Sequence, residues 1–164
     1  MNEQDKPRDR LTHVDPAGAA RMVDVSAKPV SVRTATASGK LLTSPRVIEL
    51  LRGVGVPKGD ALAVARIAGI AAAKRTPDLV PLCHPIAIHG VAVDLRVVDD
   101  GVVISATVKT ADRTGVEMEA LTCVAVAGLT LVDMVKAVDP AAVITRIQVE
   151  TKTGGMSGDW SREG

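Results

Sequence analysis

The sequence predicts a single α+β domain in which helices cover one antiparallel sheet. Strand-like and helix-like segments follow one another in the order strand, helices, two strands, helix, strand, and a tight-turn signal joins the two middle strands. The 164 residues are 46% hydrophobic and 24% charged, an ordinary composition for a globular protein. We expect one domain over residues 11–159, a disordered charged tail at 1–10 and a short C-terminal tail at 160–164.

The first strand is predicted between residues 22 and 37. This segment alternates loosely between apolar and polar residues and is rich in Val and Thr, as is typical of extended chain. Pro29 interrupts it, because proline cannot donate to a strand ladder.

Two helices follow the first strand. Ser44 is a good capping residue, Pro45 suits the first helical position, and Gly53 ends this short helix. Asp60 can cap a second helix, rich in small residues, that continues to about Arg75.

A hairpin is predicted after the second helix. Residues 86–98 and 102–110 both alternate as strands, and Asp99-Asp100-Gly101 between them is a strong turn signal.

A long helix and a last strand complete the pattern. The helix is predicted over residues 116–138, after Thr114-Gly115, and Asp139-Pro140 terminates it. The last strand, at 143–151, leads into a glycine-rich segment. The resulting order, βαββαβ, is that of ferredoxin-like α+β domains.

Subunit association is expected from the composition of the core. The chain has no Phe and no Tyr, and Trp160 is its one aromatic residue. Small aliphatic side chains each bury less area than an aromatic side chain would. Residues 120–132 of the long helix carry no charge, and a helix that is apolar on every face must be buried on every face. We therefore expect another subunit to cover one face of this helix.

Charge and cysteine content exclude several classes of protein. A net charge of +1 provides no field to attract nucleic acid or membranes, and the chain lacks aromatic platforms for stacking bases. Two cysteines make no disulfide framework. The sequence shows no signal peptide and, by inspection, no apolar stretch of spanning length, so we expect a cytoplasmic protein.

The charges at the ends of the long helix allow two interpretations. Glu117 and Glu119 suit the helix dipole, and Asp133 and Lys136 have the spacing of a surface ion pair. The functional alternative is that the carboxylate exchanges protons with, or positions, the amine. Glu117 and Asp133 lie sixteen residues apart, roughly 24 Å along a helix. If both ends serve one site, two subunits build it.

Cys83 and His84, adjacent on a proline-rich loop, suggest either a metal site or a thiol nucleophile, and His84 alone can serve as a hydrogen-bonding or proton-transfer group. The metal hypothesis is weak, since no metal-binding spacing occurs and His13 and His89 are isolated. The nucleophile hypothesis is also weak, because adjacent side chains seldom point the same way. Cys123, in the apolar helix, is expected to be a core residue.

Several cations are candidates for binding an anion. Lys152 precedes the segment GGMSG at 154–158, which suits either an anion-binding nest or a mobile tail. Lys28 and Arg33 in the first strand region add positive charge, although each alone is more often a solvated surface cation. Lys58 lies just before a helix start, where the dipole disfavours a cation, so it invites a functional explanation.

These segments together resemble the MoaC family of molybdenum cofactor biosynthesis. The similarity extends from Leu11 to Asp159, and its most specific phrases are AGIAAAKRT, PLCHP and GVEMEALT, in this order. The resemblance implies a ferredoxin-like fold assembled as a hexamer, a trimer of dimers, with sites at subunit interfaces. It also implies a lyase that converts a cyclised GTP derivative, 3',8-cyclo-7,8-dihydro-GTP, to cyclic pyranopterin monophosphate and pyrophosphate. A radical SAM enzyme supplies that substrate.

The resemblance has further implications for the cofactors, for Met156 and for the site residues. No tightly bound cofactor is implied, although Mg²⁺ can accompany the triphosphate. Many relatives read GGKSG where this chain has Met156, so phosphate binding would be weaker here if that lysine holds phosphate. The positions that match catalytic residues are Lys58, Asp133 and Lys136, and those that match substrate-binding residues are Leu82, Cys83, His84, Glu117, Met118, Glu119, Lys28, Arg33 and Lys152.

Overall fold

The sheet of this protein has five strands in the order β2-β3-β1-β4-β5, and every neighbouring pair is antiparallel. The computed structural model describes residues 11–53 and 59–163. The strands are β1 (Ser31–Leu42), β2 (Gly90–Val98), β3 (Gly101–Asp112), β4 (Val143–Thr153) and β5 (Trp160–Ser161).

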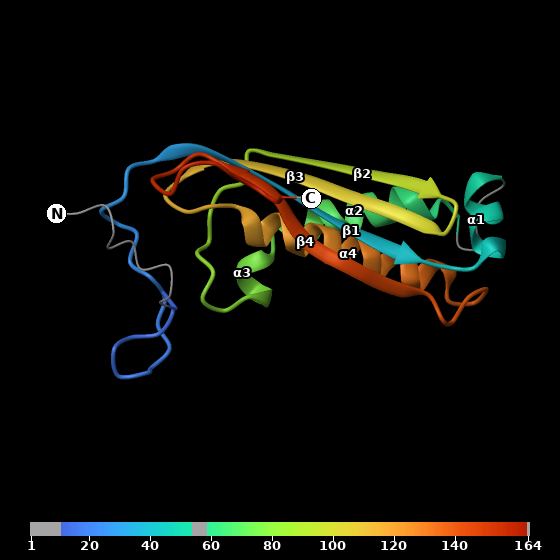
Figure 1. Cartoon of the computed structure of the whole chain (residues 1–164), viewed down its shortest axis with the longest axis horizontal. Coiled ribbons are helices and arrows are strands. Elements are labelled where there is room, and N and C mark those ends of the chain that lie inside the picture. Colours follow the sequence, from blue (N-terminus) through green and yellow to red (C-terminus); the bar gives the residue numbers. More distant parts are fainter. Residues whose placement is uncertain (1–10, 54–58, 164) are drawn as a thin grey trace.

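Helices cover one face of this sheet. In Figure 1, α2 and α4 lie side by side beneath the strands, and α1 lies at one end. The predicted antiparallel sheet with covering helices is therefore confirmed. The helices are α1 (Pro45–Arg52), α2 (Ala61–Ala73), α3 (Thr76–Leu79) and α4 (Glu117–Val135).

The predicted starts of α1 and α2 are confirmed by their caps. The Ser44 hydroxyl accepts a hydrogen bond from the Val47 amide at 3.4 Å. The Asp60 carboxylate accepts one from the Ala63 amide at 3.1 Å. Each cap satisfies an amide that has no partner within the helix.

The first strand was predicted too early in the chain. Residues 22–30 are an irregular arm, and β1 begins at Ser31 and ends at Leu42. The partner strand sets these bounds, since β1 pairs with β3 along its whole length, from Ser31 with Asp112 to Leu42 with Gly101. Alternation in a single segment cannot reveal where such a partner begins.

Small residues let the two central helices pack closely. Gly69 of α2 is buried, and a methyl group there would lie 2.9 Å from the Cys123 carbonyl oxygen of α4. Cys123 is itself fully buried, as predicted, and the largest buried core side chains are Leu41, Ile104 and Leu131. Close backbone approach compensates for the missing aromatic residues.

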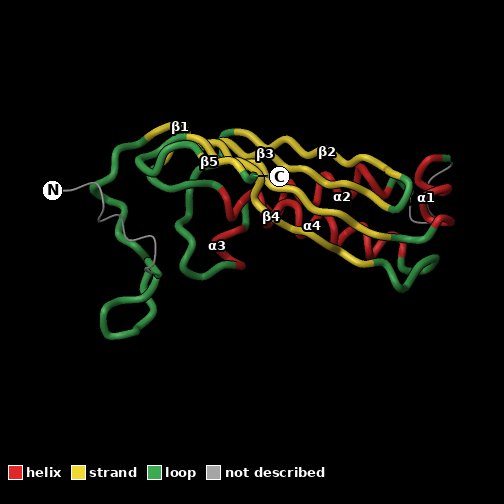
Figure 2. Tube along the Cα trace, viewed as in Figure 1, coloured by secondary structure: helices red, strands yellow, loops and turns green. Residues whose placement is uncertain are grey.

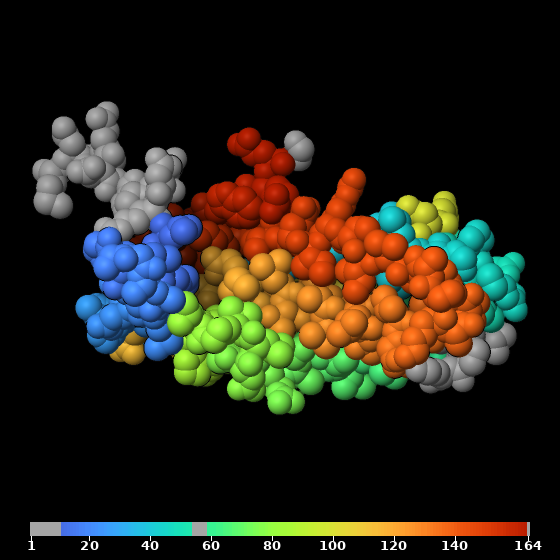
Figure 3. Space-filling view, turned by 90° about the horizontal axis from the view of Figure 1, so that it is seen from below, coloured from blue at the N-terminus to red at the C-terminus, as the bar shows by residue number. Residues whose placement is uncertain are grey.

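α4 is long and apolar enough to span a bilayer by length and composition, which corrects the sequence expectation of no such stretch. More than half of its apolar window is buried within the domain, as in the core helix of a globular protein. It nevertheless leaves Leu129 62% exposed and Met118 39% exposed, and Ile67 of the neighbouring helix α2 is 68% exposed. Figure 3 shows this surface of α4 along the helix side of the molecule.

The glycine-rich segment after β4 is a defined turn. Part of the expected C-terminal tail is the short strand β5, in which Trp160 pairs with Lys152 of β4. The charged segment 1–10, expected to be a disordered tail, lies outside the described residues.

Candidate active site

Three adjoining cavities lie at the end of the sheet from which the N-terminal arm extends. Loops gather there in Figure 2, around the start of α4. The cavities have volumes of about 390, 480 and 460 Å³, and Thr114 lines all three. They therefore form one continuous candidate site.

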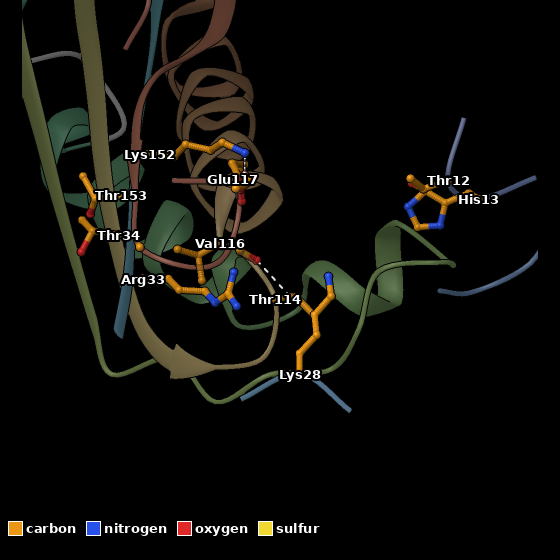
Figure 4. A pocket seen from close by; sticks show the side chains of 13 residues that line it. Thr12, His13, Lys28, Arg33, Thr34, Thr114, Val116, Glu117, Lys152 and Thr153 are labelled. Atoms are coloured by element: carbon orange, nitrogen blue, oxygen red, sulfur yellow. Dashed lines mark hydrogen bonds and ion pairs between the residues drawn. The ribbon is translucent and has the colours of Figure 1, made fainter. Parts of the chain in front are cut away.

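The cationic cavity is the first of these. Lys28 from the arm, Arg33 from β1 and Lys152 from β4 line it, together with Glu117 at the start of α4. In the view of Figure 4, Arg33 lies between the two lysines, and Thr12 and His13 face them from the other side. Three cations from three separate elements make this a place for an anion.

Arg33 is the most firmly held of these cations. Its side chain is 8% exposed, and its Nε and Nη2 donate to the carbonyls of Asp112 and Arg113 at 3.1 and 3.2 Å. These two bonds fix the guanidinium plane and leave both N–H groups of Nη1 and one of Nη2 as remaining donors. A pre-oriented arginine loses little conformational entropy when it binds an anion.

Lys152 is paired with a carboxylate inside the same cavity. Its Nζ lies 3.2 Å from a Glu117 oxygen, and both side chains are about one-third exposed (34% and 28%). A methyl group at Gly115 would collide with the Glu117 carboxylate, so glycine at this position lets Glu117 fold back toward Lys152.

The proline-loop cavity is the second and is mostly apolar. Leu82, Cys83 and His84 from the loop line it, opposite Met118 of α4. His84 Nε2 donates to the Val23 carbonyl at 2.6 Å, which ties the arm to the loop. With Nε2 protonated, Nδ1 is the acceptor available to a ligand.

Cys83 is a poor nucleophile in this setting. Burial, and then the neighbouring Glu119 carboxyl, raise the pKa of the thiol to about 11. A reactive cysteine needs the opposite shift, because the thiolate is the attacking species. The thiol lies 3.7 Å from Glu119 Oε1.

Glu119 lies behind Cys83, which lines the proline-loop cavity. It is 1% exposed, and its Oε2 has no hydrogen-bond partner within the described residues. Burial raises the pKa of this carboxyl above its ordinary value. Glu119 therefore lines none of the three cavities and supports Cys83 from beneath.

We expect Glu119→Gln to stabilise the protein at neutral pH by about 1 kcal/mol, since the amide carries no charge to desolvate. In the wild type, a raised folded pKa gives stability that is complete below the unfolded pKa and is lost as pH rises through the folded pKa. Urea unfolding between about pH 5 and about pH 8 measures this slope, and the variant should flatten it.

Glu150→Gln is the matched control for this prediction. Hydrogen bonds from Ser38 and then Gln148 lower the pKa of Glu150, so its contribution to stability is lost as pH falls. Because that loss occurs below the ordinary pKa of 4.5, Glu150→Gln should leave the slope between about pH 5 and about pH 8 unchanged, whereas Glu119→Gln should flatten it. An unchanged slope in Glu119→Gln would show that Glu119 is not neutral in the folded protein.

Asp133 and Lys136 lie at the other end of α4, away from the three cavities. Lys136 Nζ is 2.5 Å from Asp133 Oδ1, and the side chains are 57% and 55% exposed. Figure 1 shows α4 running from the loop end of the sheet to the opposite end. One chain thus does not bring this pair to the cationic cavity. Lys58 lies outside the described residues.

Two of the lining residues that the sequence did not predict connect the cavities. Thr114 lines every cavity, and His13, dismissed as isolated, lines two of them. His13 lies in the irregular segment 11–21 that precedes the arm, and this segment has no periodic sequence signal. The third cavity, the arm cavity, lies between residues 22–26, 84–86 and 112–114.

No group of three or more His, Cys, Asp or Glu side chains within residues 11–53 and 59–163 is placed to hold a metal ion. Among the described residues, Glu117 is the one carboxylate that lines the cationic cavity.

Comparison with known proteins decides the family. The model of the MoaC family matches residues 22–155. The chain belongs to the MoaC family. The matched segment contains Lys28, Arg33 and Lys152 of the cationic cavity and the pair Asp133 and Lys136, whereas His13 precedes it.

Relatives within the MoaC family are similar along almost their whole length. A cyclic pyranopterin monophosphate synthase of Streptomyces coelicolor is 69% identical over 99% of both chains. One of Nocardioides sp. is 73% identical over 96% of this chain and 98% of its own. Cyclic pyranopterin monophosphate synthase 2 of Mycobacterium tuberculosis is 58% identical over 93% of this chain and 91% of its own.

Proposed function

We propose that this MoaC-family chain is a cyclic pyranopterin monophosphate synthase, a lyase of molybdenum cofactor biosynthesis. The cyclised GTP derivative would give cyclic pyranopterin monophosphate and pyrophosphate. The observation that carries the proposal is the cationic cavity, which opens beside a largely apolar cavity with a hydrogen-bonding histidine. The cationic cavity suits the triphosphate of the substrate, and the apolar cavity suits its fused rings.

The cationic cavity would promote the phosphoryl step. A sugar hydroxyl gives up its proton to a base and attacks the α-phosphorus, the bond from that phosphorus to the bridging oxygen breaks, and pyrophosphate leaves with the electron pair. Lys28, Arg33 and Lys152 would stabilise the negative charge on the leaving group. Lys152 would exchange its Glu117 partner for phosphate, which frees the Glu117 carboxylate.

The rearrangement of the rings requires proton transfers, for which Lys58, Asp133 and Lys136 are the candidates by family resemblance. A lysine serves as a general acid or base best when it is desolvated. Lys136 is 57% exposed in one chain, and roughly 28 Å of helix separate it from Glu117 in the cationic cavity. Covering by a second subunit would both bury Lys136 and bring it to a cavity.

The exposed surface of α4 supports such an assembly. Met118 at the cavity and Leu129 near Asp133 are both exposed, and their spacing along the helix places them on one face of α4. The surface of α4 is visible in Figure 3. Apolar side chains exposed on one face of a helix are typical of subunit interfaces. We propose that the chain is a ferredoxin-like subunit of a hexamer, a trimer of dimers, with composite sites.

The remaining partners follow from the same proposal. A radical SAM enzyme would supply the substrate, and both would work in the cytoplasm without nucleic acid or membrane. No cofactor would be tightly bound. Mg²⁺ would enter with the triphosphate, and Glu117 would be its carboxylate ligand in the cationic cavity.

Release of pyrophosphate from the cyclised GTP derivative tests the activity directly. The purified chain should release one pyrophosphate for each cyclic pyranopterin monophosphate formed. A non-catalytic scaffold would bind the substrate without releasing pyrophosphate. Met156 gives little support to the scaffold alternative, because it is 77% exposed and lines none of the three cavities.

Mixed oligomers test the composite site. A chain with Lys136→Met and a chain with both Lys28→Ala and Lys152→Ala should each be inactive alone. Co-expressed, they should recover about a quarter of wild-type activity, because each site draws each contribution from the intact subunit half of the time. Absence of recovery in verified mixed oligomers would confine the site to one chain.

A further inference from the structure

The turn between β4 and β5 has a backbone that only glycine adopts easily. Gly154, Gly155 and Gly158 have φ values of 85°, 83° and 73°, in the left-handed region. The Gly154 amide donates to Asp159 Oδ1 at 3.0 Å, and the Gly158 amide donates to the Gly155 carbonyl at 3.4 Å. Asp159 thus closes a turn that would otherwise be very flexible.

This turn packs directly against Arg33. A methyl group at Gly155 would collide with Nη1 of Arg33, and one at Gly154 would collide with the Val32 carbonyl. The guanidinium is therefore held on one side by the carbonyls of Asp112 and Arg113 and backed on the other by the turn.

The same turn forms a wall of the cationic cavity. Gly154 and Ser157 line that cavity beside Lys152, whereas Asp159 does not. The base of the turn is fixed by β5, where the Arg162 amide donates to the Glu150 carbonyl at 2.8 Å and Arg162 Nε donates to the Val149 carbonyl at 2.9 Å. Asp159 is the side chain that joins this fixed base to the first residue of the turn.

We infer that Asp159 is a positioning residue, which fixes the turn 154–158 and, through it, the orientation of Arg33 for the departing pyrophosphate. The inference rests on the proposed function, because it assigns the cationic cavity to phosphates. A negative charge near an anion site opposes binding, so the charge of Asp159 does not account for its place there. Its contribution is the acceptor oxygen that orders a glycine-rich backbone before the anion arrives.

Two variants separate the acceptor from the charge. Asp159→Ala removes the acceptor, and Asp159→Asn keeps it while removing the charge. By titration calorimetry with inorganic pyrophosphate, we expect Asp159→Ala to raise Kd about tenfold, the loss of one hydrogen bond to a charged group. Asp159→Asn should stay within about twofold of the wild type. In turnover, Asp159→Ala should raise KM and leave kcat nearly unchanged.

Trp160 provides an independent measurement of the same turn. It is the sole aromatic residue of the chain, follows Asp159 directly and pairs with Lys152. Acrylamide should quench its fluorescence more strongly in Asp159→Ala than in Asp159→Asn or the wild type, because β5 loosens. Thermal unfolding of each variant checks that the domain remains folded.

The outcomes separate this inference from the proposed function. A wild-type chain that turns over substrate, with Kd and KM unchanged in Asp159→Ala, overturns the positioning role alone. Equal losses of pyrophosphate affinity in Asp159→Asn and Asp159→Ala also overturn it, since the charge of Asp159, and not its acceptor oxygen, would then account for the effect. A wild-type chain that neither releases nor binds pyrophosphate overturns both.

Discussion

Replacing Lys136 by methionine should lower kcat by about 10²- to 10⁴-fold, the range typical of losing a general acid or base. Methionine keeps most of the length and apolar surface of lysine but cannot carry a proton. Within one chain, the cost in stability should stay below about 1 kcal/mol, because the Lys136–Asp133 ion pair is more than half exposed there. An interface that buries the pair would raise this cost. Steady-state turnover and urea unfolding on the same preparation measure the two effects.

Lys40→Met is the matched control for this variant. Lys40 forms a similar ion pair with Asp100 at 2.7 Å, and Lys40 lines none of the three cavities. Lys40→Met should lower the free energy of unfolding by an amount similar to Lys136→Met and should leave kcat unchanged. Normal kcat in Lys136→Met would remove Lys136 from the chemistry and leave its pair with Asp133 as an ordinary surface contact.

Replacing Arg33 by lysine should raise KM for the substrate about 10- to 100-fold, although the charge is preserved. One ammonium group cannot hold the carbonyls of Asp112 and Arg113 and also bind phosphate, as the planar guanidinium can. A hydrogen bond to a charged group contributes about 1.5–3 kcal/mol. A buried carbonyl left without a partner should also lower the free energy of unfolding by about 1–3 kcal/mol.

Arg66→Lys is the control, because it shows how much any change from arginine to lysine alters KM and stability. Arg66 Nε donates to the Val93 carbonyl at 3.1 Å, the same kind of contact, on the exposed side of α2 away from the three cavities. The KM of Arg66→Lys should equal that of the wild type. If Arg33→Lys also kept the wild-type KM while losing stability, Arg33 would be a structural residue and not part of a phosphate site.

Elements that depend on local chemistry were predicted well. Ser44 and Asp60 cap their helices as predicted, and Asp99-Asp100 forms the turn between β2 and β3. These signals work because each acts within a few residues of the backbone that it controls. The start of β1 was missed because a strand ends where its partner ends, and that partner is β3, some seventy residues later.

The residues of the candidate site were likewise predicted only in part from the sequence. Cys83 and His84 drew attention as reactive side chains, and the structure makes them parts of a wall, with the thiol pKa raised to about 11. Thr114 and His13 gave no periodic or spacing signal, yet they join the cavities to one another. Their place depends on where the irregular arm lies, and a hydrogen bond from His84 to the Val23 carbonyl helps to hold that arm.

The sequence by itself determined the fold class, the helix caps, the hairpin and, through its specific phrases, the family. Those properties follow from local backbone preferences and from residue order. Only the tertiary structure decided that Lys28, Arg33 and Lys152, which lie more than a hundred residues apart at the extremes, share one cavity. It also decided that Glu119 is buried and that the glycine-rich segment is a fixed turn behind Arg33. Desolvation and steric backing exist only after the sheet, the arm and α4 have come together.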